Sequence, residues 1–556
     1  MSNIIVSVNN KNVTLNDQSF ISSGGEGSVY KKSGIIYKVY HNIPQFDLKN
    51  KIKELSILTS KSNILNPIEC LYFNNKPMGF TMKYADNTIA MAQVFTNSYR
   101  DRNNITNKEA VNLCMDLMET INYIHEKGVL IVDCNEFNFL VDKKTHEKSY
   151  CIDVDSYQTK SFPATALMPS IQDYSSKMFS EYSDWYSYAI LACQILIGIH
   201  PFKGKYEDNR KMKLPERMQK NISIFNNKVS VPNVVRDIQN IPNDFRNWME
   251  DEFEKGKRTK PPMLNVNIIT KPKVKKVWSS SSNINKKVIE DIEVKRVEVV
   301  NGIPLYYTKD GLWYNHKLYK NVDAGDEVLI IENIPHSVRI YKGILQIINL
   351  QIMKNVVNNS VAVMKIQVIN NTIYSLSIDN LNELGMLKVK DGYVVATKNS
   401  SNILPNATRF YKNCIYSDVM GIPYVYIPFV VGMRVLISLK EIKGHKIYDM
   451  KYENNFLQVI TYEKGIYYEH FFRFDKDHKH YIYSYHENVT PVETNFAVLL
   501  NGIVVILDGD DNICITSIRD DSEKILSSVG LGDSKLFALN RICVFSDKVY
   551  EISMMS

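Results

Sequence analysis

Residues 125–158 read HEKGVLIVDCNEFNFLVDKKTHEKSYCIDVDSYQ, and the polar groups in this stretch decide the fold of the N-terminal part of the chain. Asp133 is followed after five residues by Asn138 and after a further fifteen by Asp153. One carboxylate can orient an attacking hydroxyl, while an amide and a second carboxylate can hold Mg²⁺ on phosphates. Apolar residues on both sides predict short strands around a loop. The stretch therefore predicts a phosphoryl-transfer site.

Two features upstream fit the same chemistry. Residues 23–30 read SGGEGSVY, a glycine-rich turn whose N–H groups could approach phosphates, although such a turn alone is more often an ordinary hairpin. Lys38 lies in an apolar strand, where an unpaired ammonium would be unfavourable, so it needs an anion. ATP phosphates and a helix carboxylate would provide one. Glu54, on a helix predicted over 47–60, is the candidate for this carboxylate because of its spacing from Lys38. The alternative is that Glu54 is solvated and does not pair with Lys38.

The remaining pattern of the first half predicts a small sheet followed by helices. Residues 1–40 alternate apolar and polar side chains between turn signals, which is typical of antiparallel strands. A helix is predicted over 106–127, with Thr106 as N-cap and Glu109 completing a capping box. Further elements are predicted as two strands within 67–85, a buried helix around 188–199 and a helix over 244–255.

Length and composition indicate an ordinary globular protein with more than one core. The 556 residues are 44% hydrophobic and 23% charged, and 67 basic against 60 acidic residues leave a net charge of +7. That excess does not lead us to expect nucleic acid or a membrane as partner. The longest apolar run, 188–199, is shorter than the roughly 20 residues of a membrane span. No basic segment followed by an apolar core begins the chain, so no signal peptide is expected.

The eight cysteines are scattered and form no C-x-x-C pair. This usage predicts free thiols in a reducing, cytoplasmic compartment and argues against a cysteine zinc site. The histidines at 470, 478, 480 and 486 are read as exposed residues of a polar hairpin rather than as metal ligands. The abundance of Asn, Ile, Lys and Tyr suggests an AT-rich bacterial or viral genome.

The composition changes near residue 262. Residues 264–294 hold a basic run and a serine run and are predicted to be a linker. From 295 to 556, turn pairs such as Asp310-Gly311 and Asp391-Gly392 recur between short apolar or aromatic strands. This pattern favours a β-propeller, for which six blades would fit, and a pair of β-sandwiches is the alternative.

Taken together, the motifs of the first half carry a family resemblance. The chain resembles a protein kinase of the Ser/Thr type over about residues 10–262, and is most similar to a divergent bacterial and phage branch of kinase-like proteins. The motifs that carry the resemblance are GGEGSVY at 24–30, DCNEFN at 133–138, DVDSYQ at 153–158 and HPFKG at 200–204. The resemblance implies a multidomain chain, with an α+β bilobal kinase-like fold over 1–263, divided near residue 85, and the all-β domain after it.

The resemblance also implies a role for each matching residue. Asp133 would receive the hydroxyl proton, Lys38 would hold the α- and β-phosphates beside Glu54, and ATP with Mg²⁺ or Mn²⁺ would be the cofactors. Asn138 and Asp153 would bind the metal. Asp184 would brace the catalytic loop, and Arg258 would be structural. The implied nucleotide-binding residues are Gly24, Gly25, Gly27, Val29, Ile36, Lys38, Glu54, Met82, Tyr84, Ala85 and Leu140.

Several positions depart from the family pattern. Ile131 and Val132 stand where His-Arg usually precedes the catalytic aspartate, Asn135 replaces a lysine, and Asp155 replaces the glycine that follows the metal-binding aspartate. Ser22 stands at the first glycine of the nucleotide loop. Without the arginine, we expect any activity to be independent of activation-loop phosphorylation. The missing lysine removes a charge that would favour transfer of the phosphoryl group.

Three readings of function follow. The first is an ATP- and Mg²⁺-dependent Ser/Thr protein kinase whose β-propeller recruits a protein substrate. The second is a pseudokinase that acts as a scaffold or virion component, with a viral or host protein as partner. The third is a small-molecule phosphotransferase on the same fold. The expected location is the cytoplasm of a bacterium or an infected host cell, with the virion as the alternative.

Overall fold

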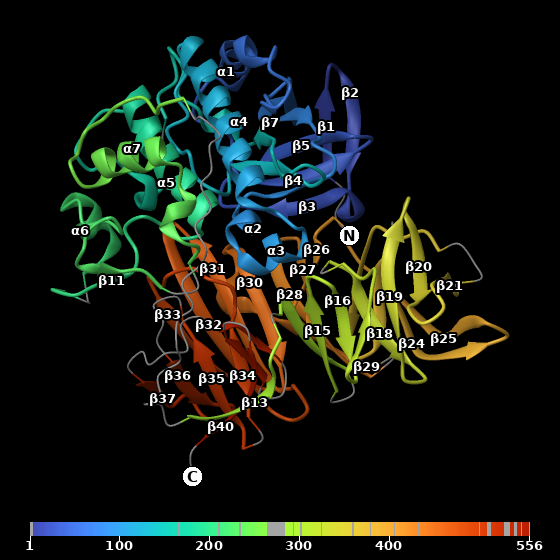
Figure 1. Cartoon of the computed structure of the whole chain (residues 1–556). Coiled ribbons are helices and arrows are strands. Elements are labelled where there is room, and N and C mark those ends of the chain that lie inside the picture. Colours follow the sequence, from blue (N-terminus) through green and yellow to red (C-terminus); the bar gives the residue numbers. More distant parts are fainter. Residues whose placement is uncertain are drawn as a thin grey trace.

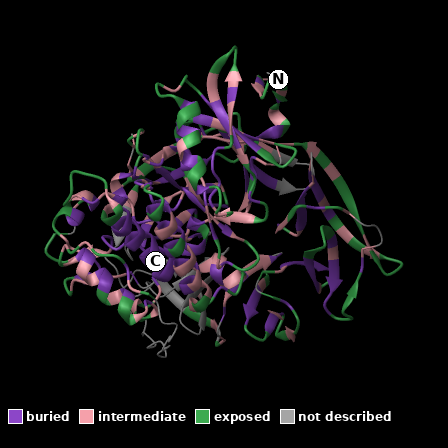
Figure 2. Ribbon diagram, turned by 90° about the horizontal axis from the view of Figure 1, so that it is seen from above, coloured by how far each residue is buried: buried purple, intermediate pink, exposed green. Residues whose placement is uncertain are grey.

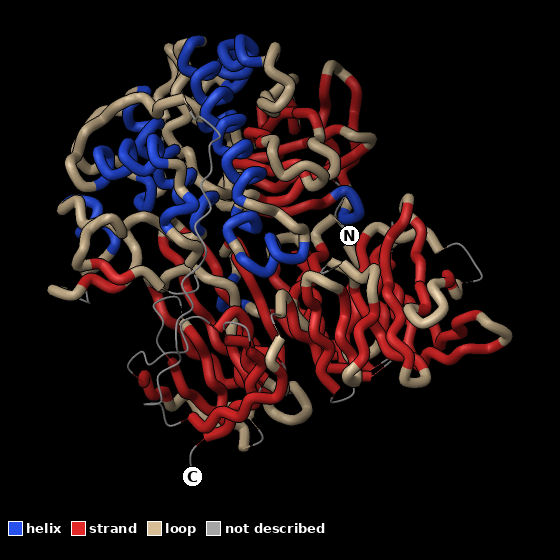
Figure 3. Tube along the Cα trace, viewed as in Figure 1, coloured by secondary structure: helices blue, strands red, loops and turns tan. Residues whose placement is uncertain are grey.

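The structure is a computed structural model in which a mixed α/β region is packed against a region made of strands (Figure 1 and Figure 3). It describes residues 4–554 apart from 165–166, 210–211, 233–234, 264–283, 293, 301–302, 324, 358–360, 378–379, 405, 431–432, 500, 509–512, 527–533, 539–541 and 546–547.

Residues 4–85 form the N-lobe, a seven-stranded antiparallel sheet in the order β2-β1-β6-β7-β5-β4-β3 with one helix against it. Positive φ angles at Asn9, Asn10 and Gly34 mark the tight turns that the sequence predicts. The sheet carries Lys38 on β5, between β7 and β4. The elements are β1 (Ile4–Val8), β2 (Lys11–Leu15), β3 (Phe20–Ser23), β4 (Gly27–Lys32), β5 (Ile35–Tyr40), α1 (Leu48–Leu55), β6 (Glu69–Phe73) and β7 (Lys76–Lys83).

Residues 86–263 form the C-lobe, where the helices gather (Figure 3). The capping box at Thr106 and Glu109 begins the long helix α4 as predicted, and Gly128, in the left-handed region, follows its end. The elements are β8 (Thr88–Ala90), α2 (Ala92–Phe95), α3 (Asn97–Arg102), α4 (Asn107–Glu126), β9 (Phe139–Asp142), β10 (Ser149–Cys151), α5 (Glu181–Ile197), β11 (Lys205–Tyr206), α6 (Leu214–Gln219), β12 (Val229–Ser230) and α7 (Asn243–Phe253).

The core of the C-lobe surrounds α5. Every residue of this helix from Asp184 to Ile197 is buried, which confirms the buried helix predicted around 188–199. Tyr188 packs edge-on against Trp185 and Phe245, and its hydroxyl donates to the carbonyl of Cys114 on α4 at 2.8 Å. The apolar face of α5 therefore fixes the helices that support the loop around Asp133. No helix within the described chain is long and apolar enough to cross a bilayer.

The C-terminal β region contains seven four-stranded antiparallel sheets within the described residues. Its strands are β13 (Ile284–Glu290), β14 (Arg296–Val300), β15 (Ile303–Thr308), β16 (Gly311–Tyr314), β17 (Lys317–Tyr319), β18 (Glu327–Ile331), β19 (Ile334–Tyr341), β20 (Ile344–Asn349), β21 (Lys354–Asn355), β22 (Lys365–Ile369), β23 (Thr372–Leu376), β24 (Asn380–Lys390), β25 (Tyr393–Asn402), β26 (Thr408–Tyr411), β27 (Cys414–Val419), β28 (Ile422–Val430), β29 (Met433–Ser438), β30 (Lys446–Glu453), β31 (Phe456–Glu463), β32 (Ile466–Phe474), β33 (Tyr481–Glu487), β34 (Phe496–Val498), β35 (Ile503–Leu507), β36 (Ile513–Ser517), β37 (Glu523–Leu526), β38 (Ser534–Ala538), β39 (Ile542–Phe545) and β40 (Lys548–Met554).

Six of these sheets are built from consecutive strands, and one joins the two ends of the region. β13 pairs with β40 from Ile284↔Met554 to Glu290↔Val549, so the first strand of the region completes the sheet of the last three. β38 in turn contacts both β14 and β34. β13 lies inside the stretch 264–294 that the sequence predicts to be a linker, and residues 264–283 of that stretch fall outside the described residues.

The β region packs against both lobes of the N-terminal region. Ala407 joins the apolar core of the N-lobe, while Tyr462 and Tyr467 join the core of the C-lobe. Figure 1 shows the same arrangement, with β26 and β27 beneath β3, and β30 and β31 beneath α2 and α3. Figure 2 shows buried residues in the interior of both regions and exposed residues along the outer loops. The β region is therefore positioned to touch the loops on which the predicted site lies.

Candidate active site

Asp133 lies in a loop between α4 and β9, and its carboxylate is held by two neighbours. The main-chain N–H of Met168 donates to Oδ1 at 3.0 Å, and the side-chain amide of Asn138 donates to Oδ2 at 3.1 Å. Burial raises the pKa of Asp133, and these hydrogen bonds oppose the rise because they stabilise the ionised form. The structure thus brings Asp133 and Asn138 together and gives the carboxylate one fixed orientation.

The backbone before Asp133 is strained and is braced by Asp184. Val132 has φ of 64°, a left-handed conformation that is unfavourable for a β-branched residue. Asp184, buried in the first turn of α5, accepts the N–H groups of Ile131 and Val132, each at 2.8 Å, and contacts His125 at 2.9 Å. Strain of this kind, typically 1–3 kcal/mol, persists only where the surroundings over-determine the conformation. Asp184 is the group that does so here.

The two expected metal ligands are neighbours. The N–H of Ile152 donates to the carbonyl of Asn138 at 2.9 Å, which sets Asn138 beside Asp153. The side chain of Asp153 is 38% exposed and its φ is 60°. No cluster of three or more His, Cys, Asp or Glu side chains able to hold a metal occurs among the described residues. A carboxylate with one amide oxygen suits Mg²⁺, which keeps several waters and binds phosphate oxygens for the rest of its shell.

Lys38 is buried and pairs with two aspartates. Its Nζ lies 2.5 Å from Oδ1 of Asp153 and 2.8 Å from Oδ2 of Asp155. Burial tends to lower the pKa of Lys38, but Asp155 and Asp153 more than offset this effect and raise it. Tyr40 donates its hydroxyl to Asp155 at 2.6 Å, which fixes that carboxylate. Asp155, the departure from glycine, is therefore part of the site.

The predicted pair of Lys38 and Glu54 is not formed in this structure. Glu54 accepts the N–H of Ser161 at 3.2 Å instead. The reason lies in the orientation of α1, whose buried face contains Lys51 but not Glu54. Asp155 occupies the place beside the Lys38 ammonium that the resemblance assigns to the helix glutamate.

The glycine-rich turn is a tight hairpin between β3 and β4. The N–H of Gly24 donates to the carbonyl of Gly27 at 2.9 Å. A Cβ on Gly27 would lie 2.6 Å from the carbonyl oxygen of Val39, so this position admits no side chain without a shift of the backbone. A Cβ on Gly25 would meet nothing within 4 Å, so space remains at the tip of the turn. The tip of the hairpin is accordingly open to solvent.

The sheet register brings together three of the implied nucleotide-binding residues, Val29, Ile36 and Met82. Val29 pairs with Lys38, and Ile36 pairs with Met82, so these side chains lie on the sheet face that carries Lys38. Leu140 lies on β9, opposite Ala90.

The chain leaving β7 carries two of the implied nucleotide-binding residues, Tyr84 and Ala85. Ala85 accepts the hydroxyl of Thr88 at 3.0 Å, and the half-exposed Tyr84 ring lies 3.6 Å from Nζ of Lys31.

Arg258 holds the segment after the metal-binding strand. Its Nε and Nη2 donate to the two oxygens of Asp173 at 2.7 and 2.8 Å, and its Nη1 donates to the carbonyl of Glu252 at 2.8 Å. Burial opposes ionisation of Asp173, but the guanidinium outweighs it and lowers the pKa of Asp173. Sequence reasoning placed Arg258 as structural but did not find its partner, because the pair is made by tertiary folding.

The β region also reaches this site. Phe137, in the loop between Asp133 and Asn138, stacks on Tyr462 with ring centroids 4.7 Å apart, and Nζ of Lys446 lies 4.8 Å from the Phe137 ring. Sequence reasoning missed Tyr462 and Lys446. No local signal marks them, because they lie far along the chain in strands that resemble their neighbours.

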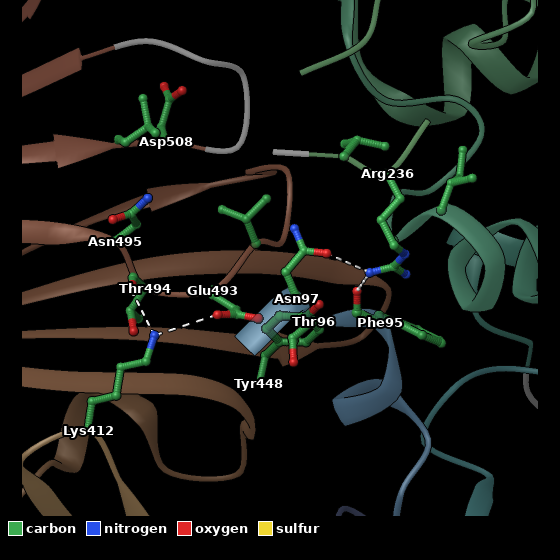
Figure 4. Close-up of a pocket in the computed structure, with 15 residues that line it drawn as sticks. Phe95, Thr96, Asn97, Arg236, Lys412, Tyr448, Glu493, Thr494, Asn495 and Asp508 are labelled. Atoms are coloured by element: carbon green, nitrogen blue, oxygen red, sulfur yellow. Dashed lines mark hydrogen bonds and ion pairs between the residues drawn. The ribbon is translucent and has the colours of Figure 1, made fainter. Parts of the chain in front are cut away.

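A separate pocket is lined by residues of both regions, and Figure 4 shows Arg236 directed toward Phe95 and Asn97, and Lys412 directed toward Glu493. Arg236 donates to the carbonyl of Phe95 at 2.9 Å and to the side chain of Asn97 at 2.8 Å, while Lys412 lies 3.6 Å from Glu493. Each of these contacts is made within one region, because Phe95, Asn97 and Arg236 lie in the N-terminal region and Lys412 and Glu493 lie in the β region. They do not belong to the site around Asp133.

Part of the chain is similar in sequence to known proteins. A protein from Acanthamoeba polyphaga mimivirus, named as a "putative serine/threonine-protein kinase", is 27% identical over 248 residues, which cover 39% of this chain and 43% of that protein. The serine/threonine-protein kinase shk1/pak1 of Schizosaccharomyces pombe is 24% identical over 210 residues, covering 35% of this chain and 31% of the relative. The chain thus spans less than half the length of these relatives.

Among solved structures, the kinase PK-1 of Cydia pomonella granulovirus matches 42% of this chain and 88% of its own, with 15% identity and a TM-score of 0.32. The family model of the protein kinase domain matches residues 23–263, the span that holds the glycine-rich turn, Lys38, Asp133, Asn138 and Asp153. The chain therefore carries a protein kinase domain at residues 23–263.

Proposed function

We propose that this chain is an ATP- and Mg²⁺-dependent serine/threonine protein kinase whose β region recruits the protein substrate. The observation that carries the proposal is the convergence of Asp133, held by Met168 and Asn138, with Asp153, held by Lys38. Those groups are an oriented proton acceptor and a metal ligand with its counter-charge. The relatives that bear the name serine/threonine-protein kinase support the choice of acceptor.

Each residue has a distinct part in the transfer. The hydroxyl oxygen of the substrate forms a bond to the γ-phosphorus of ATP while the bond from that phosphorus to the β–γ bridging oxygen breaks, and ADP leaves. Asp133 accepts the hydroxyl proton. Asn138 and Asp153 hold Mg²⁺, which would neutralise charge on the phosphates when bound. Lys38 moves from Asp153 toward the α- and β-phosphates and keeps Asp155 as its partner.

The β region is proposed to be a seven-bladed β-propeller. Seven four-stranded antiparallel sheets in chain order support this assignment, as does the sheet in which β13 joins β38–β40 and so links the ends of the region. The first strands of several neighbouring sheets contact one another: β18 meets β22, and β26 meets β30. A pair of sandwiches would stack large sheets face to face instead.

The location and partners of the protein are part of the same proposal. The active site would act on a protein in the cytoplasm of a bacterium or an infected host cell, and association with a virion is the alternative.

A pseudokinase scaffold is the second candidate, and two observations favour it. Asn135 replaces the lysine usual in active kinases of this type, and the β region packs over the loop that carries Asp133. In this reading the domain binds nucleotide or a partner without transfer.

Transfer of label from γ-labelled ATP with Mg²⁺, on the protein itself and on a generic basic protein, distinguishes the two candidates. The variant Asp153→Ala removes the metal ligand, and Asp208→Ala, an exposed carboxylate of the same lobe, is the matched control. The kinase proposal expects label in the wild type and in Asp208→Ala, and its loss in Asp153→Ala. Absence of label, with nucleotide binding that is lost in Lys38→Ala, would establish the pseudokinase instead.

A further inference from the structure

The catalytic loop lacks its own cation. Asn135 stands at the position of the usual lysine, and it is buried. Its Oδ1 accepts the N–H of Phe137 at 2.8 Å, and its Nδ2 lies 3.4 Å from the carbonyl of Asp133. The side chain therefore closes the loop on itself and presents no positive charge to a phosphoryl group. A transfer site without a cation at this point would leave the developing charge poorly stabilised.

The β region is docked on this same loop through specific contacts. The hydroxyl of Tyr467 donates to Glu136, which is buried between the two regions. Gly465, in the turn between β31 and β32, lies against Pro169, one residue beyond the Met168 that holds Asp133. These contacts, together with the stack of Phe137 on Tyr462, fix the edge of the sheet β30–β33 relative to Asp133.

Lys446 is the cation that this docking brings to the loop. It begins β30 and pairs in register with Tyr462, the residue that stacks on Phe137. Its Nζ lies 4.8 Å from the Phe137 ring, and it has no hydrogen bond or ion pair with any described residue. The side chain stays exposed to solvent and is thus open to a ligand.

Burial and the neighbouring carboxylates act on the pKa of Lys446 in opposite directions. Burial lowers the pKa of Lys446, and Asp153, Asp133 and Glu136 oppose that shift. The side chain as a whole keeps contact with solvent, while the protein around its ammonium is dense enough for burial to outweigh the three carboxylates. The geometric link to the site is the Phe137 ring, which lies 4.8 Å from Nζ of Lys446 in the loop between Asp133 and Asn138.

We propose that Lys446, contributed by the β region, is a catalytic residue that contacts the γ-phosphoryl group of ATP during transfer and takes the place of the lysine missing at Asn135. This inference rests on the proposed kinase function. As the bond to the bridging oxygen breaks and the bond to the substrate hydroxyl oxygen forms, Lys446 donates hydrogen bonds to the equatorial oxygens and keeps its proton. Asp133 takes the hydroxyl proton. The site is complete only when the β region is docked.

The test compares kcat and KM for ATP in the full chain and in three variants. Lys446→Met removes the charge and keeps much of the length of the side chain, whereas Lys446→Arg keeps a cation. Lys443→Met is the matched control, because Lys443 is an exposed lysine just before the same strand. We expect kcat to fall by about 100-fold in Lys446→Met, with KM for ATP and the melting temperature unchanged. Lys446→Arg should recover most of the loss, and Lys443→Met should match the wild type.

Three other results would contradict the inference or the kinase proposal, and each can be told apart from the others. An active wild type with equal kcat in Lys446→Met would overturn the role of Lys446 and leave the kinase proposal intact. A fall in kcat that follows a lower melting temperature and is not recovered by arginine would make Lys446 a packing residue, which also overturns the inference. A silent wild type, equal to Asp133→Asn, would remove the kinase proposal itself.

Discussion

Asp155 stands where the family pattern has glycine, yet it carries more of the site than Glu54 does. It accepts Lys38 through both oxygens, at 2.8 and 3.0 Å, and Tyr40 at 2.6 Å. Glu54 instead bonds to Ser161 and Thr159. A carboxylate two residues after Asp153 can therefore do the work that the resemblance assigns to a helix glutamate.

This assignment predicts unequal effects of two conservative changes. Asp155→Asn removes the charge that balances the buried Lys38, so we expect nucleotide affinity to fall by about 10-fold or more, since a lost charged partner is worth about 1.5–3 kcal/mol. Glu54→Gln should change it by less than about 2-fold. Titration of both variants with a fluorescent ATP analogue measures the difference. Equal losses of nucleotide affinity in the two variants, or a larger loss in Glu54→Gln, would show that Glu54 is the functional carboxylate partner of Lys38.

The residues of the site that lie close together in the sequence were predictable, whereas the contacts between residues far apart in the sequence were not. Asp133, Asn138 and Asp153 lie within one stretch whose spacing is set by a loop and two strands. The partner of Lys38 depends on which side chains of α1 face the sheet. Helical periodicity alone does not show whether Lys51 or Glu54 lies on the buried face of α1. Asp155 was visible in the motif but was read only as a departure.

Among the elements, α5 supports the loop that carries Asp133 through one side chain at its N-terminus. Asp184 satisfies two main-chain N–H groups that no other described partner takes. Asp184→Ala leaves both N–H groups buried and unpaired, at about 1–3 kcal/mol each, so the free energy of unfolding should fall by about 2–6 kcal/mol. Urea denaturation followed by tryptophan fluorescence reports it, because Trp185 adjoins Asp184. A loss no greater than that of the exposed control Asp208→Ala would contradict the bracing role.

The sheets β30–β33 and β34–β37 are joined by a titratable contact. His486 lies between Glu469, 3.4 Å from Nδ1, and Glu523, 2.7 Å from Nε2. Hydrogen bonds to Glu469 and Glu523 raise the pKa of His486 to about 10, above its ordinary 6.5.

Because the folded state holds this proton more tightly than the unfolded chain, the stabilisation from His486 is complete below pH 6.5 and disappears as pH rises through about 10. The variant His486→Gln lacks this stabilisation, because glutamine does not bind the proton. The urea midpoint of the wild type should exceed that of His486→Gln at pH 6, and the gap should narrow by pH 10.5. A gap that stays constant over this range would show that His486 is not charged in the folded protein.

For the molecule as a whole, the contact between its two regions decides whether the site is complete. Gly465 has φ of 85°, and a Cβ there would strike the ring of Pro169. Gly465→Ala should loosen the docking of β31–β32 on the kinase domain, so that amide hydrogens of residues 133–138 exchange faster. Gly392→Ala is the matched control, because its φ is 77° but a Cβ there meets nothing within 4 Å. Equal exchange in the two variants would contradict a role of this contact in ordering the loop.

The division of the chain into a kinase domain and an all-strand region was predictable, because period and composition change near residue 262. The order of seven sheets was not, since β13 finds β40 only when the ends of the region meet. Nor did any pattern indicate that Lys446 and Tyr462 would lie on the loop of Asp133. Contacts between domains leave no periodic trace in a single sequence.

The most direct test of this composite site is a crystal structure of the whole chain with Mg²⁺ and a non-hydrolysable ATP analogue. The account predicts Mg²⁺ between Asn138 and Asp153, with Nζ of Lys446 at about 3 Å from an oxygen of the γ-phosphate. A nucleotide bound with Lys446 directed away from the γ-phosphate, or no nucleotide beneath the glycine-rich turn, would contradict it.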